Sequence, residues 1–198
     1  MDWSLVIIAI IGIVVTGIRA SLAGRESKER EAARGIERDR NAAALRSMTQ
    51  ASGMSVDMVI DTGCASLALD RKAGMLSGIS DGKQVSWPLS DFLSAALRDR
   101  SGAYIHAQEM EQYYTGVRRD SLENPWGGHK RKEVKQGHED FRAFTGASVY
   151  GLELRLRGGE TKEIPFFRGD GAKFWTEGSR LEEARKFARE LDSAIRSR

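Results

Sequence analysis

The chain has 198 residues and a mass of 21.9 kDa, enough for one domain and an accessory segment but not for two full domains. Apolar residues make up 40% and charged residues 30%, and three prolines without a repeated tract exclude a low-complexity chain. The single cysteine excludes an intramolecular disulfide and a zinc site built from several thiolates. We therefore expect no metal and no other cofactor.

The net charge of +3 is concentrated near the N-terminus. Residues 19–50 hold eight Lys and Arg against five Asp and Glu, whereas residues 51–198 hold 23 against 22. A domain that binds nucleic acid usually carries a basic face. The nearly neutral main part of this chain therefore argues against nucleic acid as a partner.

A hydrophobic segment from Trp3 to Ile18 contains sixteen residues without a charge. As a helix it extends about 24 Å, and Ala20–Ala23 can lengthen it, so residues 1–23 predict a transmembrane anchor that contacts membrane lipid through residues 3–23. The alternative is a signal peptide cleaved near Ala23. That class of peptide begins with basic residues, and here the only early charge is Asp2.

Basic residues follow this segment and none precede it. They are Arg19, Arg25, Lys28, Arg30, Arg34, Arg38, Arg40 and Arg46. Because positively charged flanks remain in the cytoplasm, the N-terminus is expected outside and residues 19–198 inside the cell. Cys64 agrees with a reducing compartment. The sequence thus predicts a single-pass protein of a bacterial inner membrane.

Residues 24–53 predict a charged helix and linker between the anchor and a folded domain. Glu26 and Arg30 lie four residues apart and can pair along a helix. Apolar positions are too sparse for a sustained heptad, so a homo-oligomer through a coiled coil is the weaker alternative. We expect a solvated stalk, attracted to lipid head groups, that ends in a hinge at Ala51-Ser52-Gly53.

Residues 54–198 predict an antiparallel meander interrupted by a long insert. Short apolar runs alternate with segments rich in turn-forming residues, at 56–60, 64–69, 75–79 and 85–88. Residues 90–98 fit either a helix capped by Ser90 or a strand. The insert covers about residues 100–147, with a helix expected near 103–114, and a segment of this length is usually functional or mobile.

A hairpin and a helix complete the predicted domain. Leu152–Leu156 alternates apolar and charged residues, and Gly158-Gly159 turns the chain into a partner strand at Thr161–Phe167. Ser179 and Glu182 form a capping box that begins a helix. Its apolar residues recur at steps of three and four and predict one buried stripe: Leu181, Ala184, Phe187, Leu191 and Ile195.

This order of elements resembles bacterial pleckstrin-homology-like (PH-like) domains, in particular a membrane-tethered branch. The residues that carry the resemblance are the stretch IDTGCASLALD, the segment Trp87–Phe92 and the final GSRLEEARKFARELDSAI. The resemblance implies an α+β fold in which a bent antiparallel sheet forms an open barrel closed by the C-terminal amphipathic helix. It also implies a non-enzymatic binding or scaffolding module with a protein partner.

The segment Met58–Leu69 also resembles the active-site segment of retropepsin-like aspartic proteases, in which a hydrophobic run precedes Asp-Thr-Gly. There two carboxylates share a proton and activate water, so Asp61 would act in a homodimer. Cys64 stands where that family has Ala, Ser or Thr, and only Val149-Tyr150-Gly151 matches its second motif. Because Asp and Gly are also favoured in turns, a structural turn is the main hypothesis and the protease is the alternative.

The remaining candidates are weaker. The insert offers a candidate surface for a partner or for lipid head groups at Trp126, Lys130, Arg131 and Lys132. Because Glu133, Glu139 and Asp140 dilute its positive charge, a solvated loop is the favoured interpretation. The histidines lack the spacing of a helical metal site: His106, His129 and His138. Cys64 is interpreted as a small core residue inside a strand. The sequence contains no phosphate-binding loop, dinucleotide fingerprint or Gly-x-Ser-x-Gly motif.

Overall fold

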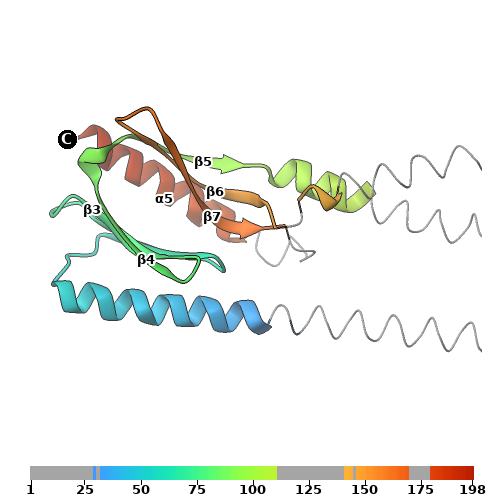
Figure 1. Ribbon diagram of the computed structural model, residues 1–198, viewed down its shortest axis with the longest axis horizontal. Coiled ribbons are helices and arrows are strands. Elements are labelled where there is room, and N and C mark those ends of the chain that lie inside the picture. Colours follow the sequence, from blue (N-terminus) through green and yellow to red (C-terminus); the bar gives the residue numbers. More distant parts are fainter. Residues whose placement is uncertain (1–28, 30–31, 111–140, 145, 170–178) are drawn as a thin grey trace, which may run out of the picture. The chain divides into compact units, whose positions relative to one another are not determined.

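The computed structural model describes residues 29, 32–110, 141–144, 146–169 and 179–198 (Figure 1). Within them, residues 37–198 form one compact unit that contains all of the described strands. No helix in the described part of the chain is long and apolar enough to cross a membrane. The predicted transmembrane anchor, residues 1–23, lies outside the described residues.

The fold is α+β, with two antiparallel sheets, neither of them closed (Figure 1). The first sheet has its strands in chain order: β1 (Met58–Asp61), β2 (Ala65–Asp70), β3 (Met75–Ser80) and β4 (Lys83–Pro88). The second contains β5 (Phe92–Asp99), β6 (Ser148–Leu156) and β7 (Thr161–Arg168). The predicted strands and the hairpin at Gly158-Gly159 are confirmed.

Most of the ambiguous residues 90–98 form a strand, from Phe92 onward, and not an α-helix capped by Ser90. Pro88 ends β4, and a short 3-10 helix, η1 (Leu89–Asp91), turns the chain into β5. Leu89 is fully buried, and its backbone N–H donates to the Gly74 carbonyl at 2.8 Å. Burial of Leu89 and then Phe92 therefore fixes the register in which the chain passes from the first sheet to the second.

The C-terminal helix α5 (Ser179–Arg196) packs against strands of both sheets. It contacts β1, β5 and β6, and the predicted apolar stripe is buried, with Phe187 and Leu191 fully so. The Asp192 carboxylate accepts a hydrogen bond from the Ala95 backbone at 3.0 Å, which fixes α5 along β5. The Ser179 side chain of the predicted capping box lies outside the described residues, and Glu182 pairs with Arg185.

The stalk prediction required the helix over residues 32–52 to be solvated along its whole length, and the structure shows that part of it is buried. Leu45 is only 2% exposed and Asn41 only 9%, so the second half of this helix belongs to the compact unit. Gly53, at φ 63°, ends it in a Schellman motif: the Gly53 and Met54 N–H groups donate to the Gln50 and Thr49 carbonyls. The expected hinge is therefore a hydrogen-bonded helix end.

The insert begins with a helix over residues 101–110, and its later part lies outside the described residues. Asp99 caps this helix by accepting from the Ser101 backbone at 2.9 Å, and Arg185 of α5 donates to the same carboxylate at 2.7 Å. Burial alone would raise the pKa of Asp99, but the Ser101 hydrogen bonds and Arg185 outweigh it and hold the pKa below 3.8. Tyr104 is buried against Phe144, with ring centroids 5.5 Å apart.

Phe187 provides the first test of this packing. Phe187→Ala should lower the free energy of unfolding by about 3–5 kcal/mol, because it leaves a cavity where α5 meets the sheets. Arg189→Ala, on the exposed face of the same helix, should change it by less than about 0.5 kcal/mol. Urea unfolding of the full-length protein in mild detergent, followed by tryptophan fluorescence, measures both. Equal losses would show that α5 does not pack through this stripe.

Asp99 provides a pH-dependent test. Its lowered pKa adds stability above the unfolded-state pKa near 3.8, and this stability is lost as the pH falls through the lower folded-state pKa. Asp99→Asn should therefore lower the melting temperature at pH 7, and its difference from the parent should shrink below pH 3.8. Asp91→Asn, at an exposed carboxylate, is the control. A difference that stays constant from pH 7 to pH 3 would contradict the capping role.

Candidate functional site

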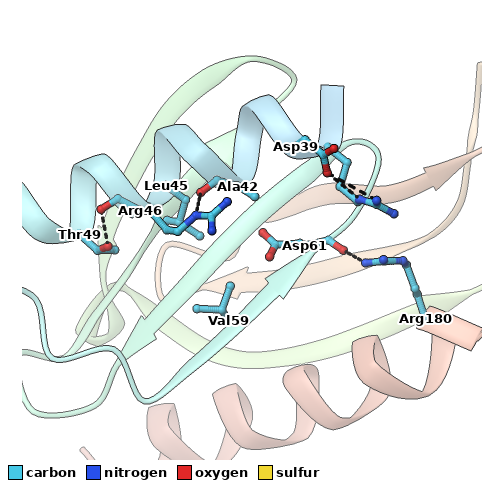
Figure 2. A pocket seen from close by; sticks show the side chains of 9 residues that line it. Asp39, Ala42, Leu45, Arg46, Thr49, Val59, Asp61 and Arg180 are labelled. Carbon is cyan, nitrogen blue, oxygen red and sulfur yellow. Dashed lines mark hydrogen bonds and ion pairs between the residues drawn. The ribbon is translucent and has the colours of Figure 1, made fainter. Parts of the chain in front are cut away.

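A cavity of about 410 Å³ lies between the helix over residues 32–52 and β1 (Figure 2). Helix residues at steps of three and four share one face, and strand residues two apart share another, so each element presents a short row to the cavity. The lining consists of Arg38, Asp39, Ala42, Leu45, Arg46, Thr49, Val59, Asp61 and Arg180. The site therefore combines three segments that are distant in sequence.

The three arginines of this lining use few of their hydrogen-bond donors. Each guanidinium carries five N–H donors. Arg38 contacts Asp39 at 3.5 Å, and the Arg46 Nε donates to the Ala42 carbonyl at 3.2 Å. Arg180 donates from Nη1 to the Asp61 backbone carbonyl. With three arginines and two aspartates, the lining has a formal charge of +1 and free donors that suit an anion.

Asp61 is the unusual group of the cavity. Its carboxylate is directed into the space between the helix and β1, while its backbone carbonyl faces Arg180 (Figure 2). The Oδ1 atom is buried and accepts no hydrogen bond within the described part of the chain. A buried acceptor without a donor costs about 1–3 kcal/mol, so it calls for a partner such as a water or a ligand.

Asp70 shows how the same sheet treats a carboxylate that has only a structural role. Asp70 is 2% exposed and closes β2. Its Oδ2 accepts from the Ser55 backbone at 2.9 Å, and its Oδ1 accepts from the Ala73 backbone at 2.7 Å. Both oxygens of Asp70 are satisfied by backbone N–H groups, whereas Oδ1 of Asp61 receives no donor from the described residues.

The Asp61-Thr62-Gly63 segment forms the turn between β1 and β2. Thr62 is fully buried, and its Oγ1 accepts from the Ala65 backbone N–H at 3.0 Å and lies 2.8 Å from the Ala65 carbonyl, to which it donates. The expected second protease motif, Val149-Tyr150-Gly151, lies within β6 of the other sheet. The other carboxylate that lines the cavity, Asp39, is 76% exposed and pairs with Arg38.

None of the remaining candidates that the structure describes lines this cavity. Trp126, Lys130, Arg131 and Lys132 lie outside the described residues, as do His129 and His138. His106 is exposed on the helix over residues 101–110. Cys64 is half-buried in the turn before β2, so its placement inside a strand was wrong. Among the described residues, no group of three metal-binding side chains comes together.

Asp61 is the one residue of the cavity lining that the sequence analysis identified as a candidate site residue. The available signal was the row Arg38, Ala42, Leu45 and Thr49, which has helical spacing but contains one large apolar residue. Arg180 gave no signal, because nothing in the sequence places the first turn of α5 next to β1. A single buried leucine is too weak a pattern to predict that a charged helix docks on a sheet.

Two substitutions distinguish the structural role of the turn from the role of the Asp61 carboxylate in the cavity. Thr62→Val should lower the free energy of unfolding by about 1–3 kcal/mol, because it leaves the buried Ala65 N–H without an acceptor. Asp61→Asn should change it by less than about 0.5 kcal/mol, because the carboxylate supports no contact of the fold. Chemical unfolding of both variants measures this. A loss for Asp61→Asn as large as that for Thr62→Val would show a structural role for the carboxylate.

Comparison of the whole chain with models of known families, with curated proteins and with solved structures gave no match. The functional assignment therefore depends on the geometry of residues 37–198.

Proposed function

We propose that the protein is a membrane-anchored, cytoplasmic binding module with a PH-like domain, and that it is not an enzyme. The observation that carries this proposal is the polar cavity, which is lined by three arginines with spare N–H donors and by Asp61, whose Oδ1 atom has no donor among the described residues. Binding requires such unsatisfied groups, whereas acid–base chemistry on water by an aspartic protease requires two carboxylates that share a proton.

The strand order supports the PH-like part of the proposal. Among the described residues, four consecutive strands pair as antiparallel neighbours in one sheet and the next three in the other, and a helix then contacts both sheets. An open barrel closed by a C-terminal helix requires this order. The insert between β5 and β6 contains Trp126 and Lys130–Lys132, which we propose as a contact for a protein or for lipid head groups.

The helix over residues 32–52 links anchor and binding in this proposal. It follows the predicted anchor and its basic flank in sequence, and it supplies six of the nine lining residues: Arg38, Asp39, Ala42, Leu45, Arg46 and Thr49. A ligand in the cavity contacts this helix and β1 together. Binding therefore stabilises the docked helix. The stabilising free energy is the difference between the ligand's binding free energies for the protein with the helix docked and with the helix undocked.

The membrane topology gives the first test. A phosphatase that is active only outside the cytoplasm, fused after Arg198, should be inactive, whereas a fluorescent protein at the same place should fluoresce. The reason is the eight basic residues after the hydrophobic segment and none before it. Both fusion proteins should pellet with membranes. Phosphatase activity, or a soluble fusion of intact length, would contradict the proposed anchor and orientation.

A cleavage assay tests the aspartic protease as the second candidate, which the cavity-facing carboxylate of Asp61 favours. Full-length protein in detergent should not cleave a peptide library between pH 4 and 7, and Asp61→Asn should behave like the parent. Cleavage by the parent that Asp61→Asn and a pepstatin-type inhibitor both abolish would replace the binding module by the protease.

A further inference from the structure

We infer that the cavity between the helix over residues 32–52 and β1 binds a zwitterionic ligand, a small group that carries both an acidic oxyanion and a protonated amine. This inference rests on the proposed binding function and names the ligand class for the same cavity. It follows from the lining charges, taken together with Oδ1 of Asp61, the one atom of the lining that is buried and has no donor among the described residues.

The arginines select the acidic end of the ligand. Arg46 donates from Nε to the Ala42 carbonyl, and Arg180 donates from Nη1 to the Asp61 carbonyl, so each guanidinium keeps further N–H donors that no described residue accepts. A planar guanidinium matches the oxygens of a phosphate or carboxylate and binds them with two parallel hydrogen bonds. Arg38 adds a third positive charge at the same lining.

Asp61 selects the other end. A simple anion that occupied the cavity would be repelled by the Asp61 carboxylate and would leave Oδ1 without a donor. A simple amine would donate to Asp61, but its positive charge would be repelled by the three arginines. One molecule with both groups satisfies both ends, and a net charge of −1 on the ligand balances the lining charge of +1.

The dimensions and the apolar wall agree with such a ligand. A volume of about 410 Å³ lies at the small end of the usual range for ligand pockets, about 300–1,000 Å³. Ala42, Leu45 and Val59 supply carbon surface between the charged residues. A short carbon spacer between the oxyanion and the amine would lie against them. Free O-phosphoethanolamine has this chemistry and a net charge of about −1. The head group of phosphatidylethanolamine carries the same two groups, with no net charge because its phosphate is a diester.

The binding experiment uses the full-length protein in a non-ionic detergent, titrated calorimetrically in a buffer without phosphate or primary amine. O-phosphoethanolamine should bind at least about tenfold more tightly than inorganic phosphate, ethanolamine or glycerol 3-phosphate. Asp61→Asn and Arg46→Ala should each weaken the binding of O-phosphoethanolamine at least about tenfold, and Asp61→Asn should thereby also remove that preference. Arg155→Ala removes an equal charge from an exposed position on β6 and should leave binding unchanged.

The results separate this inference from the proposed function. Equal affinity for inorganic phosphate and O-phosphoethanolamine, unaffected by Asp61→Asn, would overturn the zwitterionic ligand but leave a binding module for anions. Glycerol 3-phosphate that binds as tightly as O-phosphoethanolamine would overturn the requirement for an amine. If none of the four compounds binds in detergent, the inference is overturned. The proposed function is tested separately, by the topology and cleavage experiments.

The lipid environment distinguishes the two sources of the same chemistry. Nanodiscs of phosphatidylglycerol and of phosphatidylethanolamine carry the full-length protein in otherwise identical titrations. If the lipid head group is the natural ligand, free O-phosphoethanolamine should bind to the protein in phosphatidylglycerol nanodiscs. In phosphatidylethanolamine nanodiscs, the lipid head groups should compete with it and weaken its binding. Equal affinity in both would support a free ligand, and binding that survives Asp61→Asn in both would overturn the site.

Discussion

The burial of one face of α5 against both sheets is the contact on which the rest of the structure depends. Each sheet leaves apolar side chains on one face, and α5 covers them with a stripe centred on the fully buried Phe187 and Leu191. Burying two such side chains stabilises the fold by about 3–6 kcal/mol, a large share of the net stability of a domain. The same packing brings Arg180 to β1 and Arg185 to the start of the insert, so both depend on it.

The two carboxylates at the ends of β1 and β2 show where the fold satisfies its polar groups and where it does not. Asp70 receives two backbone N–H donors and is a structural element of the β2–β3 turn. Asp61 is held by its backbone, while its Oδ1 atom is buried without a donor beside three arginines. Among the described residues, Oε1 of Glu163 and the hydroxyls of Ser66 and Ser148 are also buried without a partner, but only Asp61 lines the cavity. We therefore interpret the cavity as a site for a ligand.

The sequence predicted most elements of the fold because their patterns are local. Alternation in Leu152–Leu156 and the stripe of α5 each place their apolar residues on one side without knowledge of the rest of the chain. Residues 90–98 were ambiguous because tertiary burial of Leu89 and Phe92 decides between helix and strand. The cavity could not be predicted, since it forms only where the helix over residues 32–52, β1 and the first turn of α5 meet.

The most direct test of the central claim, that the docked helix and β1 form a ligand site around Asp61, is hydrogen exchange at the backbone amides of residues 41–49 in the full-length protein. A ligand that contacts the helix and β1 together raises the free energy of local opening. O-phosphoethanolamine should slow exchange at these amides in the parent and in Arg155→Ala, and should leave it unchanged in Asp61→Asn. Exchange that is equally fast with and without the ligand in the parent, or equally slowed in Asp61→Asn, would contradict the account.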